Sequence, residues 1–326
     1  MPDFNSSSRR NFLPVACAAL GSGMAGKLHA EALTSRKVVS RLPIQPRLQW
    51  EEMNGYCGEC CVQQAALHFG TYVSQFVCRA MIAPNQKSQL LVGLNEQTVL
   101  SALRLNFVAF DYTRAPIPQF FAYFVWLKQQ LALQRPVLIT AYAKGLRDLD
   151  YDHIMLAVGF TADDIISFKS SDTLAFNDCF QQVACNRTAG TLSDNRRMRG
   201  NGARFEFCIP NAVCYGCAVT GIQDASRQAL PVRIVMESSS EPDLMAGELP
   251  LPMKGTVCIN GLAVGKSYTL YRFNDYRVVP TANYAKSAYS SAQNFIATGS
   301  TMLFPVSIPS NGMAVFRCLP ISREYK

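Results

Sequence analysis

Three cysteines lie within five residues in the stretch NGYCGECCVQQAALHFG, residues 54–70. A cysteine can serve as a structural thiol, as half of a redox pair or as a nucleophile, and a nucleophile needs a base that takes its proton. Besides His29 near the N-terminus, the sequence has two histidines, His68 and His153. The chemistry of this stretch therefore depends on which histidine reaches it.

Cys57 stands at the start of a helical pattern. Apolar residues recur at three- and four-residue spacing from Val62 to Phe69 and predict a helix over 58–69, which Gly70 ends. A thiol at such a helix start lies near unpaired backbone N–H groups, whose partial positive charge favours the thiolate. The position predicts a lowered pKa for the Cys57 thiol.

His153 is the predicted base. His68 follows Cys57 by eleven residues on the same predicted helix. That separation is three turns, so the two side chains cannot touch. His153 instead opens the apolar strand pattern DHIMLAVGF, residues 152–160, which would hold an imidazole rigidly. We therefore expect a structural role for His68.

The remaining pattern indicates an α+β domain followed by an all-β domain. Further helices are predicted at 95–105 and 117–134. Strands are predicted for five segments, antiparallel where the connections are short, at 137–143, 152–160, 164–168, 204–210 and 215–222. We place a boundary near 222–231, which gives an N-terminal domain over 33–225 and a C-terminal domain over 226–326.

Short strands separated by turn residues predict a β-sandwich in the C-terminal domain. The segment NGLAVGKSYTLYRFNDY, residues 260–276, resembles the corresponding part of fibronectin type III-like or Ig-like domains. Cys258 and Cys318 lie on two of the predicted strands. We expect these two cysteines to bridge their strands.

The order of these motifs resembles the papain-like cysteine peptidase superfamily, in particular the bacteriocin leader-processing (double-glycine) peptidase domains. The resemblance covers roughly 50–175: Cys57-Gly58, a helix ending in Phe69-Gly70, then ALQRPVLITAY and DHIMLAVGF. It implies a papain-like α+β fold, an N-terminal helix packed on an antiparallel sheet, in which the cysteine meets a histidine oriented by Asn or Asp.

The resemblance also implies roles for individual residues. Asp172, Asn177 and Asp178 are the candidates for the residue that orients His153, and we expect Asp172, with Asn177 as the alternative. The register of papain itself would make Cys60 the nucleophile in place of Cys57.

The predicted oxyanion donors depart from the family pattern. The family places a glutamine donor six residues before the nucleophile, where this chain has Glu51. An ionised glutamate is a poor hydrogen-bond donor. Gln49 or Asn54 is therefore expected to take this role.

The N-terminal 32 residues have the pattern of a signal peptide, a polar start followed by the small apolar run PVACAALGSGMAG. Arg9 and Arg10 resemble the twin-arginine export signal, and cleavage is expected near Ala30-Glu31-Ala32. The apolar run from Phe12 to Gly26 is shorter than the roughly 20 residues that a membrane span needs. Every other long apolar segment is interrupted by charged or polar residues, so we expect no span in the mature chain. The predicted location is periplasmic or secreted.

The predicted export determines whether the cysteines are expected to form disulfides. Of twelve cysteines, Cys17 lies in the predicted signal and eleven remain. In an oxidising compartment this odd number predicts up to five disulfides and one free thiol. The pairs Cys57/Cys60 and Cys214/Cys217 also fit a redox or zinc CxxC arrangement, but their separation and the predicted export favour disulfides.

Composition narrows the function classes further. The chain is 49% hydrophobic and has a net charge of +8 with only one short basic cluster, NRRMR at 195–199. A cluster this short, without aromatic residues, predicts no nucleic-acid site. A Cys–His pair needs no metal or cofactor, so we expect neither. The oligomeric state stays open.

Together these features predict an exported cysteine peptidase that hydrolyses peptide or amide bonds through Cys57, His153 and Asp172. Its partner would be a peptide or protein substrate. Two alternatives stay open. A transglutaminase-like acyl transferase would use the same residues, whereas an inactive papain-like binding or adhesion protein would use none of them for catalysis.

Overall fold

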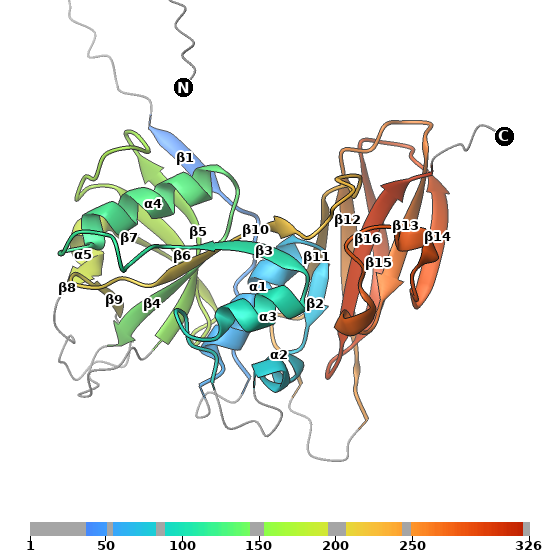
Figure 1. Cartoon of the computed structure of the whole chain (residues 1–326), viewed down its shortest axis with the longest axis horizontal. Helices are drawn as coiled ribbons and strands as arrows, with labels where there is room; N and C mark the ends of the chain where they lie inside the picture. The colour runs from blue at the N-terminus through green and yellow to red at the C-terminus, as the bar shows by residue number, and fades with distance from the viewer. Residues whose placement is uncertain are drawn as a thin grey trace, which may run out of the picture. The chain divides into compact units, whose positions relative to one another are not determined.

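The computed structural model describes residues 37–50, 55–82, 89–143, 153–194, 207–242 and 249–321. All of them belong to one compact unit, Arg36–Lys326. The unit is α+β with mostly antiparallel sheets (Figure 1). The predicted signal, 1–32, lies outside the described residues.

A nine-stranded sheet forms the larger layer, with the order β3-β10-β4-β5-β6-β7. Strand β1 pairs with β5 and β9 pairs with β4, both antiparallel, and the short β8–β9 pair is parallel. The strands are β1 (Val38–Arg41), β3 (Leu105–Ala109), β4 (Val137–Ala143), β5 (His153–Ala162), β6 (Thr173–Asp178), β7 (Val183–Thr188), β8 (Ser193–Asp194), β9 (Phe207–Pro210) and β10 (Gly216–Ile222).

Helix α1, Cys57–His68, is central to the structure, as the sequence pattern predicted. It contacts β4 and β5 of the large sheet as well as β2 and β11 of the β-sandwich described below (Figure 1). Every residue from Cys57 to Leu67 is buried. The other helices are α2 (Gln75–Ile82), α3 (Glu96–Ala102), α4 (Phe120–Ala132) and α5 (Ala189–Leu192).

Two polar side chains inside α1 find buried partners, which allows a helix with mixed polarity to be enclosed. Gln63 accepts from Arg47 Nε at 2.6 Å and donates to the Val73 carbonyl at 2.7 Å. Glu59 accepts from Arg79 Nε at 2.8 Å. These contacts fix the rotation of α1 about its axis and therefore the direction of its first turn.

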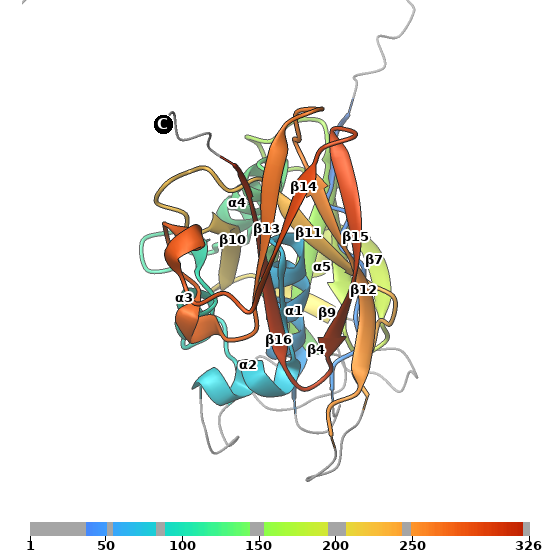
Figure 2. The ribbon, with the colours of Figure 1, turned by 90° about the vertical axis from the view of Figure 1, so that its right-hand side faces the viewer.

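The C-terminal half forms a β-sandwich, with sheets β11-β12-β15 and β14-β13-β16-β2 (Figure 2). Strand β2, Thr71–Val73, comes directly after α1 and pairs with β16 through Val73↔Met313. The sandwich thus takes one strand from the N-terminal half. Its other strands are β11 (Val232–Met236), β12 (Pro252–Asn260), β13 (Ser267–Phe273), β14 (Ser291–Ile296), β15 (Thr301–Pro309) and β16 (Met313–Pro320).

Two expectations from the sequence are wrong. The segment 164–168 is not a strand, because Asp164 Oδ1 accepts the backbone N–H groups of Ile166 and Ser167 at 2.9 and 2.6 Å and forms a turn. No disulfide joins the eleven cysteines of the described ranges, and Cys258 and Cys318 are not bridged. In the same ranges, no helix combines the length and apolar character needed to cross a membrane.

Candidate functional site

Cys57 and His153 line one cavity of about 450 Å³. Cys57 is the first residue of α1 and His153 the first of β5, and the two elements pack against each other. The remaining walls come from Gly55, the segment 89–94, Tyr112, Thr140, Ile154 and Tyr215. The fold therefore brings together at one cavity the two residues that the sequence pattern singled out, which are 96 positions apart in the chain.

The His153 ring is held on three sides. Its Nε2 lies 3.1 Å from Asp178 Oδ1 at the end of β6. Phe180 stacks on one face with centroids 3.8 Å apart, and Phe207 stacks at 4.8 Å. Nδ1 is buried and has no hydrogen-bond partner among the described residues. Nδ1 is therefore the nitrogen that is left to exchange a proton.

Burial lowers the pKa of His153, and the Asp178 carboxylate acts in the opposite direction. The imidazole is thus neutral near pH 7, which is the form that accepts a proton. Because Asp178 accepts a hydrogen bond at Nε2, the proton of the neutral ring lies on Nε2 and the lone pair lies on Nδ1. This tautomer suits a general base.

The structure gives Asp172 another role than the one expected. Its Oδ2 lies 2.6 Å from Lys128 Nζ, and both side chains are buried. Asn177 donates from Nδ2 to the Ile44 carbonyl at 3.1 Å and to Gln64 Oε1 at 2.9 Å. The carboxylate that contacts His153 belongs to Asp178, at the end of the observed strand β6.

The pKa of the Cys57 thiol is raised to about 12, opposite to the expectation from the sequence. Burial is the largest cause, and the charge of Glu59 adds to it, while a hydrogen bond with the Ile154 backbone lowers the pKa. Desolvation disfavours a thiolate more than the helix start favours it. Cys57 is therefore a neutral thiol at rest, and its ionisation requires a base.

A buried ion pair between Glu59 and Arg79 holds the start of α1. Glu59 Oε1 accepts from Arg79 Nε at 2.8 Å and from the Leu90 N–H at 3.1 Å. The Arg79 guanidinium lies 3.4 Å above the Tyr56 ring centre and donates to the Gly55 carbonyl at 2.7 Å. These contacts connect two parts of the cavity lining, Gly55 before α1 and Leu90.

Cys60, the alternative nucleophile, does not line the cavity. Its Sγ donates to the Arg47 carbonyl at 3.4 Å and lies 3.5 Å from Gln64 Nε2. Burial, followed by its contact with Cys179, raises the pKa of Cys60 well above the usual thiol range. Of the two cysteines, Cys57 is the one that lines this cavity.

The two predicted oxyanion donors have different outcomes. Asn54 and Glu51 lie outside the described residues. Gln49 is buried, and its Oε1 accepts from Cys179 Sγ at 3.5 Å, so its side chain does not line the cavity. The N-cap residue Tyr56 makes no side-chain cap hydrogen bond to α1, so it does not occupy the backbone N–H groups of the first turn.

Gly58 allows the close packing of α1 against the cavity wall. A Cβ at this position would lie 2.7 Å from both the Leu90 carbonyl oxygen and Leu90 Cδ2. We predict that Gly58→Ala displaces the Leu90 segment and lowers the free energy of unfolding by about 1–3 kcal/mol. Chemical denaturation measures this change. Ala65→Gly, the reverse exchange in the same helix, is the control for the effect of glycine and alanine on the helix itself. An unchanged midpoint for Gly58→Ala would contradict the prediction.

One group of side chains at the site has the composition of a metal site. The donor atoms of His153, Asp178 and Cys179 all lie within 4.8 Å of one another, and Cys179 Sγ is 3.9 Å from His153 Nε2. Nitrogen, oxygen and sulfur ligands together suit Zn²⁺. A metal ion there would occupy Nε2 and separate His153 from Asp178.

No protein-family model, curated protein or solved structure matches this chain. The functional assignment therefore depends on the geometry of the cavity. Sequence reasoning found Cys57 and His153. It missed the role of Asp178, for which the only signal in the sequence was its place among three polar candidates after the histidine.

Proposed function

We propose that this protein is an exported, papain-like cysteine hydrolase that cleaves peptide or amide bonds. Cys57 is the nucleophile, His153 the base and Asp178 the residue that orients His153. One observation carries the proposal: a thiol at a helix start and an imidazole with an unpartnered Nδ1, its other nitrogen held by a carboxylate, border the same cavity.

The arrangement supports the following reaction. As the substrate carbonyl reaches Cys57, the thiol proton moves to His153 Nδ1 and the sulfur attacks the carbonyl carbon. The oxyanion accepts hydrogen bonds from the N–H groups at the start of α1. His153 returns the proton to the leaving amine, and water then hydrolyses the acyl-enzyme with His153 as base, which restores the thiol.

Asp178 stabilises the imidazolium that forms after this proton transfer. The neutral resting state of Cys57 and His153 follows from their burial. Cys57 as a residue is only 8% exposed, so the reaction begins once a substrate enters the cavity beside it. Leu90, Val92 and Tyr215 line the cavity with apolar surface. For this reason we expect the substrate to have an apolar residue beside the scissile bond.

A peptide-hydrolysis assay tests the proposal. We expect Cys57→Ala to lose hydrolysis of a fluorogenic peptide library, whereas Cys185→Ala keeps it, because Cys185 is more exposed and does not line the cavity. A labelled amine, retained on the acyl product, would identify acyl transfer instead of hydrolysis. Equal activity of Cys57→Ala and the unaltered protein would exclude Cys57 as the nucleophile, and a folded protein that binds peptides without cleaving them would be the inactive alternative.

A further inference from the structure

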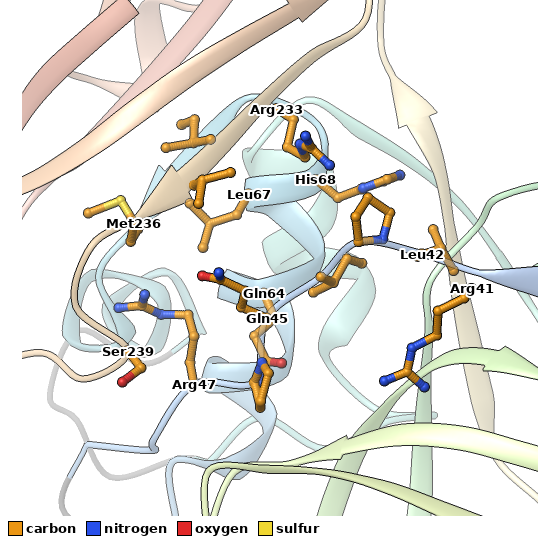
Figure 3. A pocket seen from close by; sticks show the side chains of 15 residues that line it. Arg41, Leu42, Gln45, Arg47, Gln64, Leu67, His68, Arg233, Met236 and Ser239 are labelled. Atoms are coloured by element: carbon orange, nitrogen blue, oxygen red, sulfur yellow. The ribbon is translucent and has the colours of Figure 1, made fainter. Parts of the chain in front are cut away.

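A second cavity, of about 460 Å³, shares no lining residue with the one beside Cys57. Three elements form it: the segment 41–47, the last turns of α1 and strand β11 (Figure 3). The volume is in the range of small-molecule sites in proteins. The cavity lies at the end of α1 away from Cys57, and the proposed hydrolase reaction does not use it.

The charge of this second cavity is one-sided. Arg41, Arg47 and Arg233 line it, and no aspartate or glutamate is among its lining residues. Glu241 acts electrostatically on Arg47 from outside the cavity, where Tyr72 Oη donates to Glu241 at 3.0 Å. One carboxylate thus offsets part of the charge of three guanidinium groups, and the cavity remains cationic.

Two of these guanidinium groups have unused donors. Arg47 is only 3% exposed. Its Nε donates to Gln63 Oε1 at 2.6 Å and its Nη1 donates to the Ser238 carbonyl at 2.8 Å. Its Nη2 is buried and has no hydrogen-bond partner in the described part of the chain. Arg233 Nε is also buried and unpartnered there. A buried donor without an acceptor costs free energy, which a bound anion would recover.

His68 adds a third unpartnered polar atom, its buried Nδ1, on the same side as Arg233. Burial, and then the charge of Arg233, lower the pKa of His68 to about 4. Its imidazole is therefore neutral near pH 7 and adds no charge of its own. The positive charge of the cavity comes from the arginines.

Arg47 and Arg233 mark separate ends of the cavity. Figure 3 shows the Arg47 guanidinium beside Met236 and Ser239, whereas Arg233 and His68 lie apart from it, with Leu67 and Gln64 in between. Leu67 and Met236 give the space between the charged ends an apolar wall. A ligand that satisfies both ends needs two anionic groups joined by an apolar chain.

We propose that this cavity binds a small organic dicarboxylate, with one carboxylate on Arg47 Nη2 and the other on Arg233 Nε. The apolar chain of the ligand lies along Leu67 and Met236. Arg41, which is exposed at the cavity, attracts the ligand. This site is independent of the proposed hydrolase activity.

Calorimetric titration of the full chain with the series glutarate, adipate and suberate tests the proposal. We expect at least one dicarboxylate to bind, hexanoate to bind at least about tenfold more weakly, and the neutral adipamide to give no binding. No binding by any of the three dicarboxylates would overturn the proposal. Inorganic phosphate that binds as tightly as the best dicarboxylate would overturn it as well, since the site would then select only an oxyanion.

Variants locate the site. Arg233→Gln and Arg47→Gln are each expected to weaken dicarboxylate binding at least about tenfold. Lys266→Gln removes the same charge from an exposed position outside the cavity and should bind as the unaltered protein does. Arg233 is only partly buried, so its variant tests the site even if Arg47→Gln fails to fold, and unchanged affinity in Arg233→Gln overturns the proposal. Cys57→Ala should bind normally, which separates this result from the hydrolase test.

Discussion

Replacing Asp178 by asparagine is expected to lower kcat for peptide hydrolysis about 10²- to 10⁴-fold. An amide carries no charge and cannot stabilise the imidazolium that forms when His153 takes the thiol proton. Its NH₂ group can also donate to Nε2, which would leave the ring proton on Nδ1 and block the base. Because the substitution keeps the size of the side chain, steady-state kinetics should change far more than the thermal midpoint.

Asp172→Asn is the matched control for this prediction. It makes the same chemical change in a buried aspartate six residues earlier in the chain, one that contacts Lys128 in place of His153. We expect it to lower stability and to keep kcat per folded molecule within a few-fold of the unaltered value. The opposite pattern, with activity lost in Asp172→Asn and kept in Asp178→Asn, would return the orienting role to Asp172.

Replacing Lys128 by methionine is expected to lower the free energy of unfolding by about 3–5 kcal/mol. Lys128 is fully buried, and its Nζ contacts Asp172 Oδ2 at 2.6 Å and the carbonyls of Asp164 and Ser167 at 2.9 and 2.5 Å. Methionine fills a similar volume but leaves the Asp172 carboxylate buried without its cation. Urea denaturation measures the loss.

A second substitution tests the reason for that loss. In Lys128→Met combined with Asp172→Leu, no unpaired charge remains, so much of the stability should return. Recovery in the double variant would identify the uncompensated carboxylate as the cause. A loss below about 1 kcal/mol in Lys128→Met alone would contradict the account of this pair.

The sequence predicted the parts of the site that local periodicity encodes. Apolar spacing identified helix α1 and placed Cys57 at its start, and the run after Asp152 identified β5 with His153 as its first residue. A regular apolar pattern within a segment is the main signal of its secondary structure in a sequence. For this reason the two candidate residues were found without a structure.

The residue that orients His153 was predicted wrongly because one strand was predicted in the wrong place. Ile165, Ile166 and Phe168 resemble a strand, but the Asp164 carboxylate captures backbone N–H groups and turns the chain. The strand forms later, as β6, and ends at Asp178 in place of Asp172. Competition of a short polar side chain with regular structure is a local effect that apolar spacing does not reveal.

Two other features arise from contacts between distant segments. The sequence shows that Cys57 begins a helix, but it does not show the burial that raises the pKa of the thiol to about 12, which accompanies the packing of α1 against β4 and β5. Strand β2 joins the sandwich by pairing with β16, from the far end of the chain. Patterns within a segment do not specify a partner about 240 residues away.

The most direct test of the account is mass-spectrometric mapping of the native, nonreduced protein after reaction with a peptidyl vinyl sulfone. The account predicts a single adduct on Cys57, lost in His153→Ala and retained in Cys185→Ser. An adduct on Cys60 or Cys185 with Cys57 unmodified, or Cys57 recovered in a disulfide, would contradict the proposed nucleophile.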